Sequence, residues 1–301
     1  FFKQKTAYEM CGRDWSSDVC SSDLVLRYTP FYRTIKQLID DGQGGEVASL
    51  SQVENVGYWH HAHSFVRGNW RCSEQTSPMI LQKSCHDMDI LLWLSGQRCT
   101  RVSSFGSLHH FDAAHAPQDA PLRCTDGCPH SVVCPYDAGK IYLTDNVGWP
   151  TEMLTTDLSR EGRLKALREG PYGRCVYHCD NDVVDRQVVN LEFDNGAVAS
   201  FTMTAFTTDM ARQLKVCGTK GQITADMNAN TVSLHRFGES GPREITLETP
   251  PQTNNYGHGG GDYYLMRDFV RAIQSGGDGN LSSARVSLQS HLICLDRKSV
   301  V

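Results

Sequence analysis

One segment of the sequence carries side chains that could move a proton. Residues 78–94 have a helical spacing of apolar positions, and Gln82 and His86 lie four residues apart, which places them on one face of a helix. Oxidation of an alcohol by hydride transfer also releases a proton, and histidine has an ordinary pKa that suits its acceptance near neutral pH. His86, with Gln82 beside it, is therefore a candidate catalytic group of an acid–base site, a role that spacing alone does not establish. The alternative is a helix with a Lys83–Asp87 ion pair and a structural histidine at a domain edge.

The loop predicted over residues 60–76 could bind the hydroxyl groups of a substrate. It combines the hydrogen-bonding side chains of His60, His63 and Arg67 with the aromatic ring of Trp70. Such a mixture suits a polyol or a carboxylate. The alternative is a surface loop whose histidines have no special role.

Two further polar residues lie where a ligand could approach a strand or the backbone. Asp182 stands at the start of the predicted sheet region, and His258 lies in the run 257–262, whose glycines leave room close to the backbone. We predict that both bind substrate. The alternatives are a plain turn around Asp182 and, for His258, a loop before a helix capped by Asp262.

Two cysteine-containing segments could together hold a metal ion. The first has the spacing C-x3-C-x5-C and the second C-x3-C, both within irregular, loop-like sequence. A structural zinc ion takes about four thiolate or imidazole ligands, often from two loops. Buried free thiols and a disulfide are the alternatives. The predicted zinc ligands are Cys124, Cys128, Cys134 and Cys179, with Cys175 or His130 as possible substitutes.

The pattern of elements predicts how these side chains are positioned. From residue 183 onward, apolar and polar residues alternate on both sides of Asp194-Asn195-Gly196, and again around residues 218–221, which predicts two hairpins. Helical patterns come before this region, starting at Pro30, and a last helix is expected over 262–274. Helices followed by hairpins predict one α+β domain, an open, mostly antiparallel sheet with helices on one face.

Composition excludes some classes of partner, and the two ends stand apart from the rest. A net charge of −5 without a basic cluster argues against nucleic acid as a partner. No apolar run approaches the ~20 residues of a transmembrane helix, so we expect no membrane partner. Residues 1–24 and 296–301 resemble translated sequencing adapters, which leaves 25–295 as the domain. Without a natural N-terminus, the cytoplasm is the default location.

The order of these motifs resembles the glucose–fructose oxidoreductase / inositol dehydrogenase (Gfo/Idh/MocA) family. The resemblance rests on RYTPFYRTIKQLIDDG, HHAHSFVRGNW, a helix with HDMD, VVDRQVVNLEFDNG, GTKG and GHGGGD, and it covers the C-terminal part of a family member. It implies that His86 is the acid–base residue and that Tyr28 and Asp89 belong to the substrate pocket. Gln82 stands where the family has an aspartate, so it could orient a hydroxyl group but not accept its proton.

The resemblance also implies a cofactor and a second domain. Family members bind NAD or NADP in a Rossmann domain that supplies a lysine, whereas no Gly-x-Gly-x-x-Gly follows a strand in residues 25–295. We therefore expect the substrate-binding domain of a sugar or polyol dehydrogenase, a homo-oligomer through its open sheet, and a fragment that is inactive alone. A sugar-binding module and a dimerisation module, neither of them catalytic, are the alternatives.

Overall fold

The structure is a computed structural model that describes residues 24–248, 258–274, 281 and 284–295. The two segments interpreted as adapter-derived lie outside these residues, except for Leu24, which is buried. In the described ranges, no helix is long and apolar enough to cross a membrane. The α-helices are α2 (Pro30–Asp40), α3 (Tyr58–His61), α4 (Met79–Gln82), α5 (Cys85–Ser95), α6 (Ala138–Tyr142), α7 (Arg160–Glu169), α8 (Gly261–Gln274) and α9 (Ala284–Leu295).

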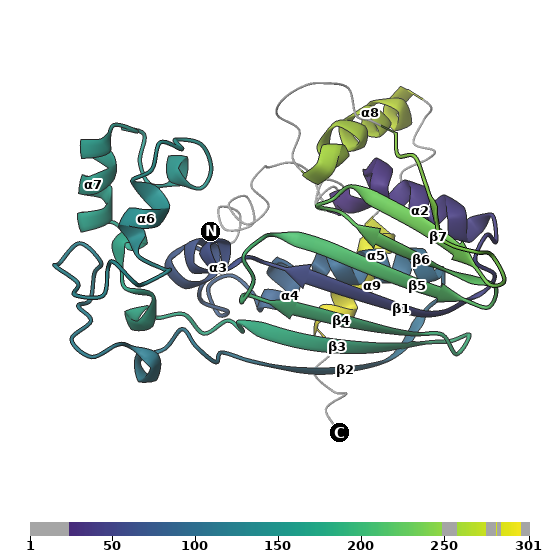
Figure 1. Cartoon of the computed structure of the whole chain (residues 1–301), viewed down its shortest axis with the longest axis horizontal. Coiled ribbons are helices and arrows are strands. Elements are labelled where there is room, and N and C mark those ends of the chain that lie inside the picture. The colour runs from purple at the N-terminus through teal and green to yellow at the C-terminus, as the bar shows by residue number, and fades with distance from the viewer. Residues whose placement is uncertain (1–23, 249–257, 275–280, 282–283, 296–301) are drawn as a thin grey trace.

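One sheet organises the described residues (Figure 1). Its order is β2-β3-β4-β1-β5-β6-β7-β8; β1 and β4 run parallel, and every other neighbouring pair is antiparallel. This confirms the predicted α+β class and the mostly antiparallel sheet. The strands are β1 (Val47–Asn55), β2 (Cys99–Ser107), β3 (Arg186–Phe193), β4 (Val198–Thr204), β5 (Ala211–Gly218), β6 (Gly221–Asp226), β7 (Thr231–Arg236) and β8 (Arg243–Glu244).

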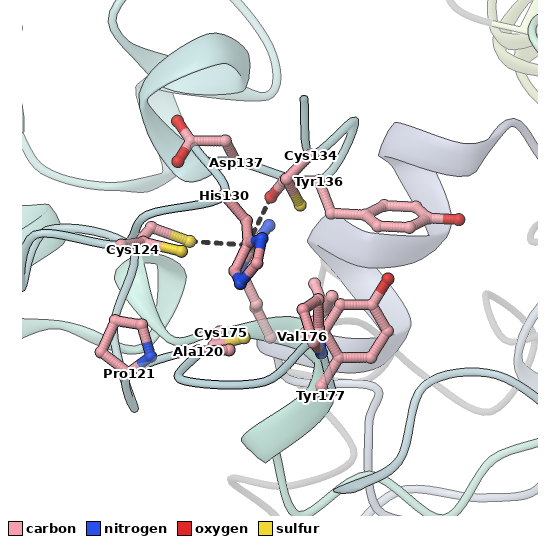
Figure 2. Close-up of a pocket in the computed structure, with 13 residues that line it drawn as sticks. Ala120, Pro121, Cys124, His130, Cys134, Tyr136, Asp137, Cys175, Val176 and Tyr177 are labelled. Atoms are coloured by element: carbon pink, nitrogen blue, oxygen red, sulfur yellow. Dashed lines mark hydrogen bonds between the residues drawn. The ribbon is translucent and has the colours of Figure 1, made fainter. Parts of the chain in front are cut away.

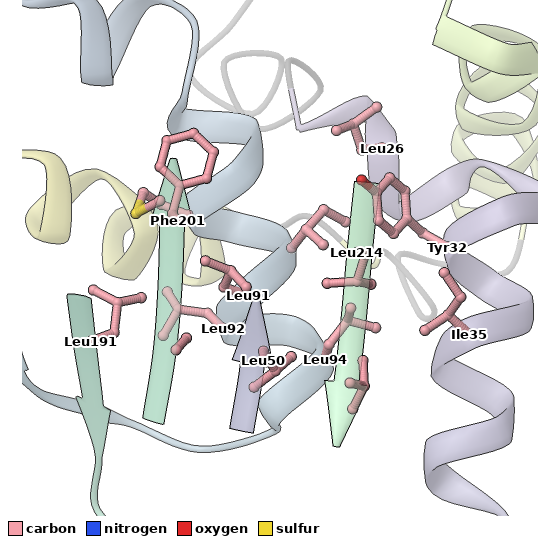
Figure 3. Packing of buried hydrophobic residues seen from close by; sticks show 14 of the residues in the cluster. Leu26, Tyr32, Ile35, Leu50, Leu91, Leu92, Leu94, Leu191, Phe201 and Leu214 are labelled. Carbon is pink, nitrogen blue, oxygen red and sulfur yellow. The ribbon is translucent and has the colours of Figure 1, made fainter. Parts of the chain in front are cut away.

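Helices cover one face of this sheet and form the main core with it (Figure 3). Leu50 of β1, Phe201 of β4 and Leu214 of β5 point to this face and are almost fully buried. They pack with Ile35 of α2 and Leu91 of α5 in one continuous apolar cluster. Because successive strand residues alternate between the faces, the intervening positions form a second face of serine, threonine and a few apolar side chains.

Both predicted hairpins are present. Strands β3 and β4 pair across Asp194–Ala197, where Gly196 has a φ of 85°, a conformation that glycine adopts without steric cost. Strands β5 and β6 pair across Thr219 and Lys220. Turn sequences and alternation are local signals, so they identified these elements correctly.

The predicted single helix over 78–94 is wrong, because the chain breaks between α4 and α5 at Lys83 and Ser84. Ser84 has a ψ of 3°, outside the helical range, and the backbone carbonyl of Ser84 accepts the N–H of Met88 to begin α5. The break separates Gln82 from His86. The two residues therefore do not share the helical face that their spacing predicts.

The segment 108–185, between β2 and β3, forms an extension at one end of the sheet. Figure 1 shows α6 and α7 of this extension beyond the sheet end where α3 lies. Its own core is small, with Ala138, Tyr142 and Leu167 as the buried members of one cluster. A second cluster joins the extension to the π-helical turn η3 (Ala62–Arg67), which follows α3.

Candidate functional site

A buried network of charged side chains lies at the end of β1, directly under the start of α5. The Arg212 Nε lies 2.8 Å from Glu54 Oε2 and 2.9 Å from Asp87 Oδ1, and both carboxylates are buried. The Lys83 Nζ lies 3.3 Å from the other oxygen of Glu54. Gln52 donates its amide N–H to Asp87. Lys83 thus pairs with Glu54 and not with Asp87, which corrects the ion pair considered from the sequence.

The network balances the cost of burial with opposite charges. Burial raises the pKa of Glu54, while Arg212 and Lys83 oppose this rise. Burial also disfavours the charge on Arg212, but the carboxylates of Asp87 and Glu54 raise its pKa above the ordinary value. Removing one member would leave the others as uncompensated buried charges, which is strongly destabilising. The strand β1, the start of α5 and the start of β5 are therefore held together at this point.

His86 lies next to this network on the first turn of α5. Burial lowers its pKa well below the ordinary value, and the positive charges of Arg212, His258 and Lys83 lower it further. The imidazole is therefore neutral at neutral pH. Its Nδ1 is buried and has no hydrogen-bond partner among the described residues. A neutral imidazole with a free lone pair can accept a proton from a ligand.

His258 is the predicted substrate residue that the fold brings to His86. The two ring centroids are 6.1 Å apart, although the residues are 172 positions apart in the sequence. His258 is exposed, and its Nδ1 lies 3.1 Å from Asp262 Oδ1. His86 and His258 thus form a pair of neighbouring rings, the second of which is exposed.

Gln82, Asp89 and Asp182 make contacts elsewhere. The Gln82 amide donates to Thr76 Oγ1 at 2.7 Å and so closes a local turn. Asp89 is buried and accepts two 2.6 Å hydrogen bonds from the Arg27 guanidinium. Asp182 is exposed and accepts the backbone N–H and the hydroxyl of Ser73, each at 2.7 Å. The structure therefore does not bring these three side chains together with His86; each binds a different partner within the domain.

The remaining predicted substrate residues lie in the interior. Tyr28 is buried next to the Arg33 guanidinium, which lies 5.6 Å from its ring centroid. His63 is buried, with its Nδ1 2.9 Å from the Tyr142 hydroxyl. Arg67 is fully buried and donates to the carbonyl oxygens of Arg174 and Tyr136. His60 is also buried, but its ring contacts a half-exposed tryptophan. Of the predicted loop over 60–76, residues 60–67 are thus helical and pack against the extension, and the rest is turns and irregular chain.

The cysteines of the extension surround a small cavity (Figure 2). Cys124, Cys128, Cys134 and Cys175 line a space of ≈ 20 Å³, about one water molecule. Cys179 does not line it, because its thiol donates to the Cys175 carbonyl at 3.3 Å.

The zinc prediction is not supported. In the described part of the chain, no three His, Cys, Asp or Glu side chains are arranged to hold a metal ion. A cation already lies among the thiols, since the Arg67 Nη2 is 3.6 Å from Cys124 Sγ. The ten cysteines that the structure describes are free thiols; Cys85 and Cys175 are buried, and the other eight are partly exposed.

Three members of the site were absent from the sequence prediction: Glu54, Lys83 and Arg212. Glu54 had a signal that could have revealed it, because Leu50, Gln52 and Glu54 alternate along β1 and share its inward face. A carboxylate at an inward position near the end of a strand needs a buried partner. The identity of that partner, Arg212 on β5, could not be read from spacing.

A separate hollow of ≈ 1010 Å³ lies at the other end of the sheet. It is lined by the start of β2, the end of β3 and part of α9. None of the predicted site residues lies in it, so we place the candidate site at His86.

Comparison with known proteins shows the family to which the chain belongs. The family model described as GFO/IDH/MocA C-terminal domain matches residues 32–224. The chain is 26% identical over 266 residues to YteT of Bacillus subtilis, which is named an oxidoreductase; the match covers 80% of this chain and 58% of YteT. The chain therefore spans little more than half the length of that relative.

Solved structures share the fold. A levoglucosan dehydrogenase in complex with NADH and levoglucosan has a TM-score of 0.58 and 17% identity, over 90% of this chain and 62% of that one. An NADPH-dependent oxidoreductase from Desulfitobacterium hafniense has a TM-score of 0.53 and 16% identity, over 89% and 58% of the two chains. The resemblance seen in the sequence is confirmed: the chain belongs to the GFO/IDH/MocA family, and its residues 32–224 match the C-terminal domain.

Proposed function

We propose that this chain supplies the substrate-binding and acid–base part of a nicotinamide-dependent dehydrogenase that acts on a CH–OH group of a sugar or polyol. The observation that carries the proposal is His86, whose imidazole is neutral and has a buried nitrogen with no partner among the described residues. The names of the related proteins, an oxidoreductase and a sugar dehydrogenase with bound NADH, support the reaction class.

The chemistry assigned to the chain is transfer of the hydroxyl proton. As the alcohol carbon loses a hydride and becomes a carbonyl carbon, the hydroxyl proton passes to the imidazole of His86. Burial, together with the cationic groups of Arg212 and Lys83, keeps that imidazole unprotonated before the reaction. The two cationic groups also stabilise negative charge that develops on the alcohol oxygen. His258, the exposed ring next to His86, is placed to hold a neighbouring hydroxyl.

The proposed oxidant is NAD or NADP, whose nicotinamide ring accepts the hydride when bound. His86 fits such a partner, because an imidazole kept neutral serves as proton acceptor while the hydride leaves. We propose that the nucleotide lies over the His86 side of the domain and that the chain needs a nucleotide-binding domain for turnover.

Replacement of the residue aligned with His86 in full-length YteT tests this function. With asparagine there, we expect kcat for nicotinamide reduction to fall about 10²–10⁴-fold, the usual contribution of a general base. KM should change little. Unchanged turnover with a normal KM would remove His86 from the mechanism. A matched control replaces the residue aligned with Asp182, whose partner is Ser73 of the same domain.

We also propose that the domain forms a homo-oligomer through the open face of the sheet. Phe105, Val188 and Val198 lie on this face with 69%, 39% and 48% of their surface exposed. Light scattering should give at least a dimer, and Phe105→Glu with Val188→Glu should give a monomer. A monomeric wild-type chain at micromolar concentration would contradict this proposal.

We also propose that the protein is located in the cytoplasm. It is favoured by the ten free thiols of the described residues, which suit a reducing compartment.

A further inference from the structure

A half-exposed tryptophan of the extension packs against α3. Trp149 has 40% of its surface exposed, although its ring contacts three other rings. Its centroid is 5.3 Å from Trp59 of α3 and 5.0 Å from His60, both in edge-to-face geometry. His63 supports it from within at 5.7 Å. The ring is therefore held firmly in place while part of it remains open to solvent.

His60 adds a hydrogen-bond acceptor to this aromatic group. Its Nδ1 lies 3.2 Å from the Val56 carbonyl oxygen, and since a carbonyl only accepts, Nδ1 carries the proton. Burial, together with the charge of Lys83, lowers its pKa to about 2, so the ring stays neutral. The Nε2 then has a free lone pair, and it has no partner among the described residues. Trp149, Trp59 and His60 are named here the aromatic corner.

Lys83 relates the aromatic corner to the His86 site. Trp59 and His60 follow shortly after β1, whose last inward side chain is Glu54. Glu54 pairs with Lys83, and the charge of Lys83 acts on both His60 and His86.

The chemistry of the corner selects among possible ligands. An indole ring packs well against the flat C–H face of a pyranose, and a neutral acceptor nitrogen suits a hydroxyl donor. An acyclic polyol has no such face, and the corner itself carries no charge to hold an anion. We propose that the aromatic corner is a subsite for a pyranose ring, so that the substrate is a cyclic sugar or glycoside and not an open-chain polyol. This inference rests on the proposed function, whose reaction it narrows.

Binding to the intact chain tests the subsite without any turnover. Titration with methyl β-D-glucopyranoside, followed by calorimetry and by the indole N–H signals in ¹⁵N spectra, should show saturable binding that shifts two indole signals. Sorbitol should bind at least about ten-fold more weakly. Trp149→Leu should weaken pyranoside binding at least ten-fold, and Trp149→Tyr should retain most of it. The matched control is Phe237→Leu, which removes an exposed aromatic ring at the turn after β7.

Each outcome decides the question. Equal binding of sorbitol and pyranoside, or wild-type affinity in Trp149→Leu, would overturn the subsite. If circular dichroism shows that Trp149→Leu does not fold, the indole signals of the wild-type chain provide the test. The absence of any shifted indole signal at saturating pyranoside would then overturn the subsite. Loss of turnover in YteT bears on a different residue, so pyranoside binding that depends on Trp149 would stand even if His86 proved dispensable.

Discussion

Three buried histidines should make the domain sensitive to acid. Burial lowers the pKa of His60 to about 2 and those of His61 and His63 to about 4, with the charges of Lys83 and Arg67 adding to the effect at His60 and His63. In the unfolded chain, each histidine titrates near its ordinary pKa of about 6.5. The unfolded state therefore binds more protons as pH falls below 6.5, and folding is favoured less.

The size of the effect follows from the difference in proton binding. Stability from these groups is fully present above pH 6.5 and decreases by up to about 1.4 kcal/mol per pH unit for each histidine below it. Between pH 8 and pH 5, each histidine should cost about 2 kcal/mol, so the three together should cost about 4–6 kcal/mol. That is a large part of the total stability of a domain of ordinary size.

Urea unfolding at a series of pH values measures this dependence. The decisive variant is His61→Phe, because His61 stacks on Phe111 at 5.2 Å and its ring is fully buried. Between pH 8 and pH 5, the free energy of unfolding of the variant should fall by about 2 kcal/mol less than that of the wild type. His235→Gln on β7 is the control for removal of a histidine. A slope in His61→Phe that equals the wild-type slope would refute the argument from burial.

Three further predictions concern stability and reactivity. Asp89→Asn should lower the free energy of unfolding by about 3–5 kcal/mol in urea, because the buried charge of Arg27 loses its opposite charge; a loss below about 1 kcal/mol would show that water reaches the pair. Phe201→Ala in the core should lower the free energy of unfolding by about 3–5 kcal/mol in the same assay. A loss as small as that of a surface substitution would contradict this prediction. Cys175, whose pKa burial raises to about 11, should react with iodoacetamide at pH 7.5 about 100-fold more slowly than a free thiol; mass spectrometry of the native protein tests this, and an equal rate would place the thiol in solvent.

Local patterns in the sequence predicted most of the sheet but not the extension. The turn at Asp194–Gly196 and the alternation around it depend only on neighbours, so β3 and β4 were predicted correctly. The break at Ser84 is different, because Lys83 turns to pair with Glu54, 29 residues earlier. Residues 108–185 have no long periodic pattern, because aromatic and thiol side chains, not an amphipathic helix face, hold them in place.

The candidate site shows the same division between local and distant interactions. His86 could be named because the proton chemistry of one side chain and a short motif suffice. Arg212, which acts on its pKa, and His258, 6.1 Å away, approach it only through tertiary folding. Composition and spacing contain no information on such contacts, so they identify a candidate acid–base residue but not its electrostatic surroundings.

The buried histidines and arginine connect the stability of the extension to the proposed recognition of substrate. The extension has few apolar residues of its own, so its position depends on side chains from the turn after α3. Arg67 donates to two of its carbonyl oxygens, and His63 contacts both Tyr142 and Trp149. These residues were expected to touch a substrate, but their geometry suits a supporting role. By fixing Trp149 against Trp59, they allow an otherwise weakly packed segment to present a rigid ring at the proposed subsite, so that little conformational entropy is lost when a sugar binds.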